Sequence, residues 1–426
     1  MTFSRDYQAL RSGAVLGEIS PRGQIAVGGK DRAAYLQGLL TNDIQALGPG
    51  TGCYAAWLTP QGRLITDLHV LESGDMILLD VPLDLVEGTV QRLEQFLFSE
   101  DVQLGDLRAS LRGVWIHGPS AAALLERTLT GLSGLAEWPE YHNARAAFGE
   151  TAAVVARIDQ LGVAGYCVYL EPLGAASLST ALAAAGAVAA SRDAIEAARI
   201  EAGTPVFGTD MGTDTIPLEA GIEARAISFS KGCYVGQEVI IRVMHRGQGR
   251  VAKKLVVLGV EGEPPAPGSK VFAGEREVGA VTSSAQSPSE GASEGASEGA
   301  QPGALALAYL HRDFLAPGTR VEIDAPAGRV GATVRLKPDP TSPGPAEAGP
   351  HDEYVGSAFR RTARAIQSTL HPPAGIRASP AHPAAPSASL ARASAAACRP
   401  GRTSRNAASR CDQDTHAWSR GRDRGR

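Results

Sequence analysis

The stretch SKGCYVGQEVIIRVMHRG, residues 230–247, gathers glycines, one thiol and several charged side chains around a single apolar run. Gly232 and Gly236 stand on either side of Cys233, so the backbone there can adopt a left-handed conformation or approach a ligand closely. The β-branched residues 239–241 follow directly. Because such residues favour extended backbone, they predict a strand that leaves the glycine turn. The thiol is therefore expected on a tight turn at the start of a strand.

Cys233 is the residue of this stretch with the most distinctive chemistry. Lys231 precedes it by two positions. A nearby cation favours the thiolate, so we predict a thiol pKa below the ~8.5 of free cysteine. Cys233 and Lys231 are therefore candidate catalytic residues. The alternative is structural, because a free cysteine often packs as a small hydrophobic residue. The turn chemistry alone leaves both interpretations open.

The octet KGCYVGQE, residues 231–238, closely resembles the signature of the YgfZ family. Proteins of that family bind tetrahydrofolate and help to assemble or repair iron–sulfur clusters. They are related to the glycine-cleavage T-protein, an aminomethyltransferase. The resemblance covers roughly residues 7–336 and implies a T-protein-like folate-binding fold in which Cys233 is the reactive centre. It also implies folate contacts from four further side chains of the stretch: Tyr234, Gln237, Glu238 and Arg242.

Residues 29–43, GKDRAAYLQGLLTND, resemble the opening of YgfZ and T-protein chains, which lies near the folate cavity. The resemblance makes Asn42 and Asp43 candidate folate ligands, although plain turn chemistry accounts for both residues as well. Residues 199–205 resemble a family stretch in which a helix delivers an arginine and a glutamate. Glu201 is a candidate ligand there, because a carboxylate can pair with a ring N–H and an amino group of a pterin. The alternative is an intrahelical ion pair with Arg199, or a pairing with another nearby base.

One dipeptide departs from the T-protein pattern. That enzyme carries two adjacent aspartates where this chain has Thr66 and Asp67, and an aspartate there takes part in aminomethyl transfer. A threonine cannot supply a carboxylate to a folate nitrogen. We therefore expect the glycine-cleavage reaction to fail in this protein. Asp67 is a candidate folate ligand. The alternative, which is equally open, is that Asp67 is a solvated strand residue without a ligand.

Composition restricts the class of protein. The chain has 426 residues, of which 43% are hydrophobic and 5% aromatic, which suits two or three packed domains. It has neither a run of 18 apolar residues, which would predict a transmembrane helix, nor the pattern of a secretory leader. Its five cysteines are too scattered for a disulfide framework or a zinc site. No metal, no membrane partner and a reducing cytoplasm are expected.

The net charge of −4 hides an asymmetry. Residues 1–337 carry 28 basic and 38 acidic side chains, whereas residues 338–426 carry 13 arginines, no lysine and 7 acidic side chains. The acidic body argues against nucleic acid as a direct partner. The tail lacks a repeated apolar period and is expected to be disordered. A shifted or extended reading frame is one origin for it, and an arginine-rich arm for an anionic surface is the other.

The order of the apolar patterns predicts an α+β fold. The first strands and a helix are expected at 23–27, 52–58, 63–71, 76–81 and 83–98. A similar alternation over 111–200 makes residues 1–247 a folate-binding region of two interleaved subdomains. Five or six short strands predict a small β-barrel over 248–337, as the T-protein resemblance also implies. Three SEGA repeats predict a disordered insertion at 285–303.

The resemblance implies a tetrahydrofolate-dependent factor for iron–sulfur cluster assembly or repair, with an effect on tRNA modification through cluster enzymes. Its partners are then a folate derivative and iron–sulfur client or assembly proteins. Two alternatives stay open: a folate-dependent aminomethyl or one-carbon transferase, and a folate-regulated scaffold without chemistry of its own. Cys233 and the Thr66 replacement favour the first interpretation over the transferase.

Overall fold

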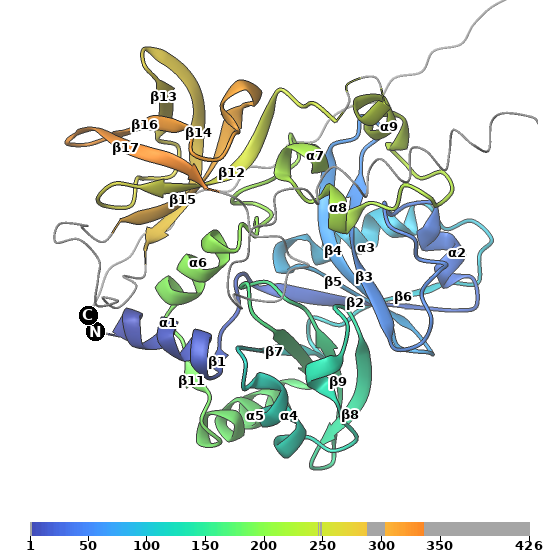
Figure 1. Ribbon diagram of the computed structural model, residues 1–426. Coiled ribbons are helices and arrows are strands. Elements are labelled where there is room, and N and C mark those ends of the chain that lie inside the picture. Colours follow the sequence, from blue (N-terminus) through green and yellow to red (C-terminus); the bar gives the residue numbers. More distant parts are fainter. Residues whose placement is uncertain (1, 246, 248, 288–302, 336–426) are drawn as a thin grey trace, which may run out of the picture. The chain divides into compact units, whose positions relative to one another are not determined.

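Three β-structures make up the computed structural model, which describes residues 2–245, 247, 249–287 and 303–335 (Figure 1). Two of them are open sheets and the third is a closed barrel. No helix within these residues is long and apolar enough to cross a membrane. The combination of mixed sheets and helices with a terminal barrel confirms the α+β fold expected from the sequence.

The first sheet is antiparallel and has the strand order β3-β4-β5-β2-β6. Its strands are β2 (Arg22–Gly28), β3 (Thr51–Leu58), β4 (Leu64–Glu72), β5 (Ile77–Pro82) and β6 (Gln103–Asp106). Two helices, α2 (Arg32–Gln37) and α3 (Val86–Glu94), pack their apolar side chains against one face. A 3-10 turn, η1 (Leu83–Leu85), precedes α3, so the helix is shorter than the predicted range 83–98.

Strand β4 divides its side chains between two environments, because successive residues of a strand point to opposite faces. Leu68 joins the apolar core that contains α2 and α3, whereas Leu71 joins the core on the other face. By this alternation the side chain of Thr66 points to the same face as Leu68, toward the helices. Asp67 and His69 point with Leu71, away from the helices.

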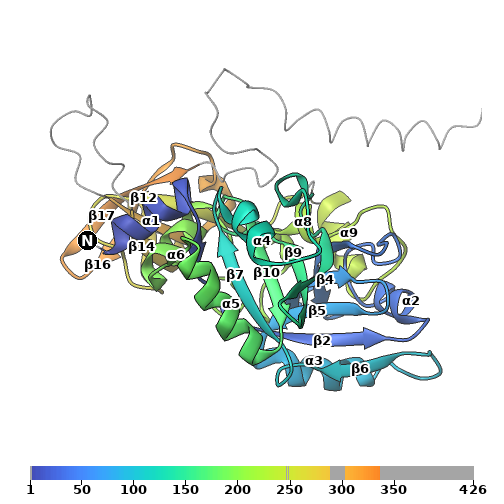
Figure 2. The ribbon, with the colours of Figure 1, turned by 90° about the horizontal axis from the view of Figure 1, so that it is seen from below.

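The second sheet has the order β11-β1-β7-β10-β9-β8. Its strands are β1 (Val15–Leu16), β7 (Arg112–His117), β8 (Asn143–Phe148), β9 (Thr151–Arg157), β10 (Gly165–Leu170) and β11 (Val188–Ala189). The helices α4 (Ala121–Thr128) and α5 (Pro172–Ala184) cover one face (Figure 2). The opposite face shares an apolar core with the face of the first sheet that lies away from α2 and α3, through Trp115 and Tyr169 on one side and Ala56 and Leu71 on the other. The two sheets therefore face each other.

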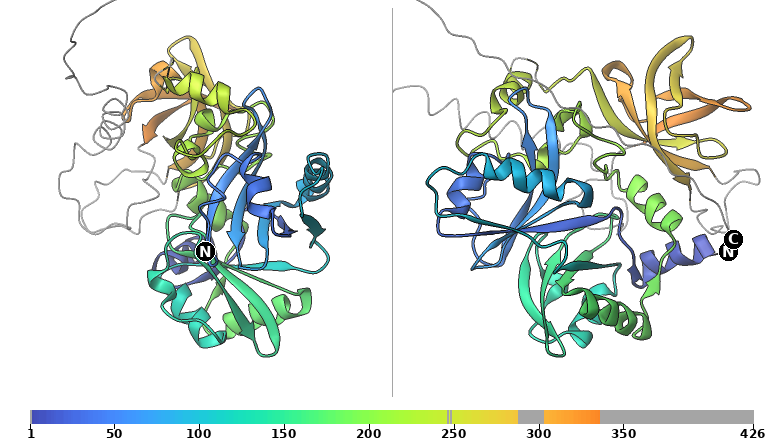
Figure 3. Two further views of the ribbon diagram at one scale, coloured as in Figure 1. Left: turned by 90° about the vertical axis from the view of Figure 1, so that its right-hand side faces the viewer. Right: turned by 180° about the vertical axis from the view of Figure 1, so that it is seen from behind.

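The remaining helices lie between or beside these sheets. They are α1 (Thr2–Ser12), α6 (Arg192–Glu201), α7 (Pro217–Ala220), α8 (Glu223–Ala226) and α9 (Gln237–His245), with the short turns η2 (Leu135–Glu137) and η3 (Arg312–Phe314). Helix α6 packs against α1 and against β14 and β15 of the barrel (Figure 3). Its apolar side chains Ala197 and Ile200 join Leu255 and Leu305 in one buried cluster.

The barrel closes in the order β12-β15-β14-β13-β16-β17, which confirms the predicted barrel. Its strands are β12 (Lys253–Val260), β13 (Lys270–Ala273), β14 (Arg276–Gln286), β15 (Ala304–His311), β16 (Arg320–Ala325) and β17 (Gly328–Arg335). Strand β14 continues to Gln286, and the N–H of Ser287 donates to the carbonyl of Gly303 at 2.9 Å. Residues 285–287 and Gly303 are thus part of the β14–β15 hairpin, although they lie at the two ends of the range 285–303 that was predicted to be a disordered insertion. Residues 288–302 and the tail from 338 lie outside the described residues.

The prediction of a strand after the glycine turn is wrong, because residues 237–245 form helix α9. The reason is packing on one side of the segment. Ile240 is fully buried, and Val243 and Met244 pack against the same core, which is the three- and four-residue spacing of a helix. This tertiary contact outweighs the strand preference of the β-branched residues. Gly236 begins the turn at φ +85°, where the carbonyl oxygen of Thr59 leaves no room for a side chain.

Candidate functional site

A narrow cavity lies between the two sheets. Its walls come from the β1–β2 connection and the start of β2, the inner faces of β3 and β4, the β9–β10 loop, the loop before α7, and α8 with the residue before it: Ile19, Ser20, Arg22, Tyr54, Asp67, His69, Gln160, Thr204, Pro205, Val206, Phe207, Ile222 and Arg225. The free space is about 20 Å³, which accommodates a single water molecule. A larger ligand would therefore have to turn lining side chains outward.

Asp67 supplies a carboxylate to this cavity. The side chain is buried, and its Oδ2 accepts a hydrogen bond from the Tyr54 hydroxyl at 2.9 Å. The guanidinium of Arg22 lies 3.5 Å from the same oxygen. The other oxygen, Oδ1, is buried and has no hydrogen-bond partner among the described residues. The interpretation of Asp67 as a solvated strand residue is therefore wrong, because the sheet carries the carboxylate inward.

A second carboxylate, Asp80 on β5, lies behind the cavity wall and is surrounded by donors. Arg22 Nε donates to its Oδ2 at 3.0 Å, and Gln24 donates to its Oδ1 at 2.9 Å. His69 Nδ1 contacts Oδ2 at 3.0 Å. Burial opposes ionisation of Asp80, but Arg22 and His69 outweigh it and hold the pKa below its usual value. Asp80 thus stays ionised and fixes both neighbours.

Arg225 closes another side of the cavity. Its guanidinium donates to the Glu140 carboxylate and to the Tyr141 hydroxyl, each at 2.8 Å, and lies 5.4 Å from the centre of the Tyr54 ring. Burial raises the pKa of the Tyr54 phenol well above its usual value, and Asp67 adds to this effect. Tyr54 therefore remains protonated and holds one oxygen of Asp67 in place.

Most residues of this cavity were not predicted from the sequence. Arg22, Tyr54, His69 and Arg225 line the cavity, and none of them was among the candidate site residues predicted from the sequence. One signal was available: alternation along β4 places position 69 on the same face as Asp67. The others come from separate strands and loops, and no local pattern connects them.

Lys231 belongs to a neighbouring polar cluster. Its ammonium donates to the main-chain carbonyls of Gln37 (2.6 Å), Leu40 (2.6 Å) and Asn42 (2.9 Å). Burial lowers the pKa of Lys231 to about 8, although Asp43 and Cys53 oppose this effect. The cation is thus engaged by the segment that follows α2. Its predicted action on Cys233 stays a prediction.

Asn42 and Asp43 shape the turn that carries these carbonyls. The Asn42 amide donates to the carbonyls of Tyr54 (2.8 Å) and Arg225 (3.0 Å), and so ties two cavity-lining segments together. Asp43 accepts a hydrogen bond from the Gln37 amide at 3.0 Å. Neither side chain lines the cavity. Their geometry is that of turn residues at its border.

The other residues predicted from the signature do not meet at one point. Cys233 is exposed, and its neighbour Gly232 faces open space. Tyr234 is buried, with its ring 5.2 Å from the Lys231 ammonium. On α9, Glu238 and Arg242 form an exposed ion pair at 3.4 Å, and Gln237 begins the helix. None of these five signature residues lines the cavity.

Glu201 ends α6 and holds α1 in place. Its carboxylate accepts hydrogen bonds from the Tyr7 hydroxyl and the Arg11 guanidinium. It does not line the cavity. The expected alternative, a pairing with a nearby base, describes what Glu201 does in this structure, although the base is Arg11 rather than Arg199.

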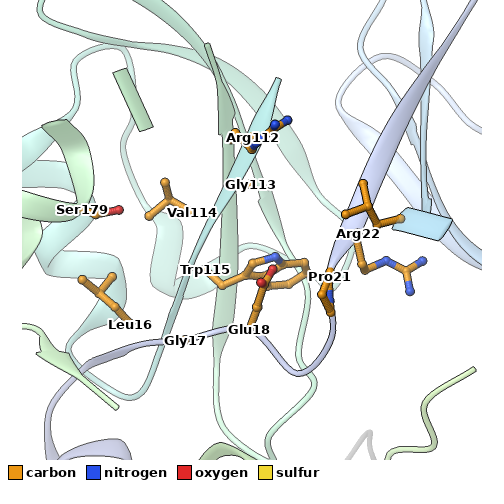
Figure 4. A pocket seen from close by; sticks show the side chains of 11 residues that line it. Leu16, Gly17, Glu18, Pro21, Arg22, Arg112, Gly113, Val114, Trp115 and Ser179 are labelled. Atoms are coloured by element: carbon orange, nitrogen blue, oxygen red, sulfur yellow. The ribbon is translucent and has the colours of Figure 1, made fainter. Parts of the chain in front are cut away.

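A second, larger pocket of about 340 Å³ lies on the other side of the segment that carries Arg22 (Figure 4). Trp115 and Glu18 lie close together in it, and Arg112 stands at one end. Burial raises the pKa of Glu18, and the charge of Asp80 acts in the same direction. The sequence analysis had not predicted this pocket.

Cys233 is expected to react with iodoacetamide before Cys53 and Cys167. It is exposed, whereas burial raises the pKa of Cys53 to about 12 and Cys167 is fully buried. Peptide mapping by mass spectrometry after brief alkylation of the full chain measures each thiol separately, including Cys398 and Cys411. Modification of Cys53 or Cys167 ahead of Cys233 would contradict this order.

Comparison with known proteins assigns the fold to a class of folate enzymes. Residues 1–231 match the GCVT N-terminal domain, and residues 253–339 match the glycine cleavage T-protein C-terminal barrel domain. The chain therefore belongs to the glycine cleavage T-protein family. This family uses tetrahydrofolate, in agreement with the cofactor expected from the sequence.

The relatives and one solved structure agree with this family. An aminomethyltransferase of Rubrobacter xylanophilus is 32% identical over 67% of this chain and 75% of its own length. An aminomethyltransferase of Geobacillus kaustophilus is 28% identical over 78% and 89%. The crystal structure of the glycine cleavage system aminomethyltransferase T from Bartonella henselae has the same fold, with a TM-score of 0.68, 22% identity, and coverage of 78% of this chain and 88% of that one.

Proposed function

We propose that this protein is a folate-dependent aminomethyl or one-carbon transferase and that Asp67 is its central carboxylate. The observation that carries the proposal is the unpartnered Oδ1 of Asp67, which is buried beside the cavity between the sheets. A buried carboxylate oxygen without a partner is costly unless a ligand supplies a donor. A folate N–H or a cationic amine is such a donor.

The surroundings of Asp67 suit the transfer of a one-carbon unit between nitrogens. Tyr54 and Arg22 hold Oδ2, so the carboxylate is fixed beside the cavity rather than free to rotate, and its Oδ1 has no partner among the described residues. Nitrogen attack on the one-carbon unit creates positive charge, and an oriented carboxylate in a buried site stabilises that charge strongly. Asp67 would therefore act mainly by charge and orientation.

Thr66 stands where the T-protein has an aspartate, and this replacement was the reason for expecting that the glycine-cleavage reaction fails. The position of Thr66 in the structure removes that reason. Its side chain lies on the opposite face of β4 from Asp67, and it is fully buried. No residue at position 66 could reach the cavity from that face. A threonine in place of an aspartate at position 66 thus leaves the Asp67 carboxylate at the cavity unchanged. The aminomethyltransferase names of the relatives also support the transferase over the cluster-assembly role.

Two measurements on the full chain test the proposal. Titration calorimetry with tetrahydrofolate should detect binding, and incubation with tetrahydrofolate and an aminomethylated carrier protein should release ammonia well above the background rate. Binding without turnover would contradict the transferase and favour a folate-regulated scaffold. Absence of binding would contradict both.

A second candidate function is iron–sulfur cluster assembly or repair of the YgfZ type. The exposure of Cys233 on its glycine turn favours it, because an accessible thiol can react with a partner protein. Cys233→Ser keeps the size of the side chain and removes the nucleophile. If this role holds, the variant should bind tetrahydrofolate normally and lose activity in a cluster-maturation assay. Full activity in that assay would exclude a chemical role for the thiol. Its clients, an effect on tRNA modification and a cytoplasmic location belong to the same candidate.

A further inference from the structure

His69 is a titratable residue of the cavity for which the proposed reaction has so far had no use. It lies two positions after Asp67 on the same face of β4 and lines the cavity. Only 2% of the residue is exposed. Three aromatic rings surround the imidazole, with centroids 5.6 Å (Tyr54), 5.8 Å (Tyr141) and 6.3 Å (Trp115) away. The ring is therefore held rigidly.

The hydrogen bond to Asp80 sets the tautomer of this imidazole. Asp80 is ionised and can only accept, so Nδ1 of His69 must carry the proton in the 3.0 Å contact. Asp80 is itself fixed by Arg22 and Gln24. Nε2 of the neutral ring then bears a lone pair, and it has no hydrogen-bond partner within the described residues.

The charges around His69 keep it neutral. Burial lowers its pKa from the usual 6.5, the charge of Arg22 acts in the same direction, and Asp80 and Asp67 oppose them only in part. The phenols of Tyr54 and Tyr141 also face the ring, and burial raises the pKa of each, so they remain uncharged. A neutral imidazole with a free lone pair is a proton acceptor near pH 7.

We propose that His69 is the proton acceptor of the transfer reaction and that Asp80 is its positioning residue. Nε2 takes the proton that the attacking folate nitrogen loses while the lone pair of that nitrogen forms the new C–N bond. The electron pair of the broken C–N bond leaves with the original amine, and His69 returns the proton to that amine, which departs as ammonia. The bond between the carbon and the carrier breaks in a second displacement, in which another folate N–H forms the second C–N bond and the carrier's leaving atom takes the electron pair and the proton that this nitrogen loses. His69 ends the cycle neutral, and Asp67 faces the positive charge in between. This inference rests on the proposed transferase function.

The ligand-free protein already tests the first part of this inference. In full chain labelled with nitrogen-15 and carbon-13 at pH 7.5, the His69 ring should show a protonated Nδ1 and an unprotonated Nε2, and addition of tetrahydrofolate should shift the Nε2 resonance. The ring signals are assigned through their correlation with the histidine Cβ, so no variant is needed. The opposite tautomer, or an Nε2 signal unmoved by saturating tetrahydrofolate, would overturn the proposal.

Turnover of the aminomethylated carrier tests the second part. His69→Gln retains a polar group but cannot take a proton, so kcat should fall by about 10²-fold with little change in the Kd for tetrahydrofolate. The acidic decline of the wild-type kcat should have its midpoint below the usual imidazole pKa of 6.5, because burial lowers the pKa of His69, and the variant should lack this decline. His311→Gln, in the barrel, is the matched control and should behave as wild type.

The outcomes separate the two proposals. An active wild type whose rate and pH profile are unchanged in His69→Gln would contradict the role of His69 and leave the transferase intact. A wild type that binds tetrahydrofolate but shows no turnover would contradict the transferase, and the proton transfer with it. If His69→Gln does not fold, Asp80→Asn gives the same test, because loss of the positioning carboxylate should lower kcat and move the acidic decline in pH.

Discussion

Asp67→Asn is expected to reduce kcat for one-carbon transfer by about 10²- to 10³-fold. The amide has nearly the same shape, and its oxygen can still accept from the Tyr54 hydroxyl. The unpartnered oxygen is replaced by an N–H donor, so a folate N–H or a cationic amine meets a donor where it needs an acceptor. The negative charge that balances the transition state is lost as well. Steady-state release of ammonia measures the effect.

Thr66→Val is the control on the same strand. Valine matches threonine in shape, and position 66 faces the opposite core, so the variant should keep the wild-type rate. Circular dichroism and thermal melting of both variants exclude unfolding as the cause. If Asp67→Asn turned over as fast as Thr66→Val, the central role of Asp67 would be wrong.

Asp210→Ala is expected to destabilise the protein by about 3–5 kcal/mol, the usual cost of removing one partner of a buried ion pair. Asp210 is buried, and it accepts from Arg199 at 2.8 Å and from the N–H of Val206 at 2.9 Å. Its other oxygen accepts from the hydroxyls of Thr282 and Ser283 on β14, each at 2.6 Å. One carboxylate thus joins α6, its following loop and the barrel. Its loss would leave the buried Arg199 guanidinium with Glu196 as its remaining ionic partner.

The midpoint of urea unfolding, followed by circular dichroism, measures this effect. Asp324→Ala in the barrel is the matched control, because that aspartate forms an exposed ion pair with Arg329 at 3.4 Å. Exposed pairs contribute at most about 1 kcal/mol. Equal losses in the two variants would show that the Asp210 cluster is not the junction inferred from the structure.

Local patterns in the sequence were sufficient for the fold class and for several elements. The apolar pattern over residues 63–71 correctly predicted a strand. The short apolar runs after residue 250 correctly predicted a barrel. These inferences succeed because strand periodicity and turn chemistry are properties of neighbouring residues. The resemblance of a continuous motif, residues 231–238, correctly indicated the wider T-protein family, whereas the YgfZ assignment within it stays a prediction.

The sequence by itself thus determined the α+β fold with its barrel, the T-protein family and the strand that carries Asp67. Tertiary structure alone decided that residues 237–245 form a helix, because the core contacts of Ile240 outweigh local propensity. It also decided that Lys231 faces carbonyls of the segment after α2. The cavity itself depends on packing two sheets face to face. Tyr54, Asp67 and Arg225 meet there from segments far apart in the chain, and no local spacing encodes contacts of that range.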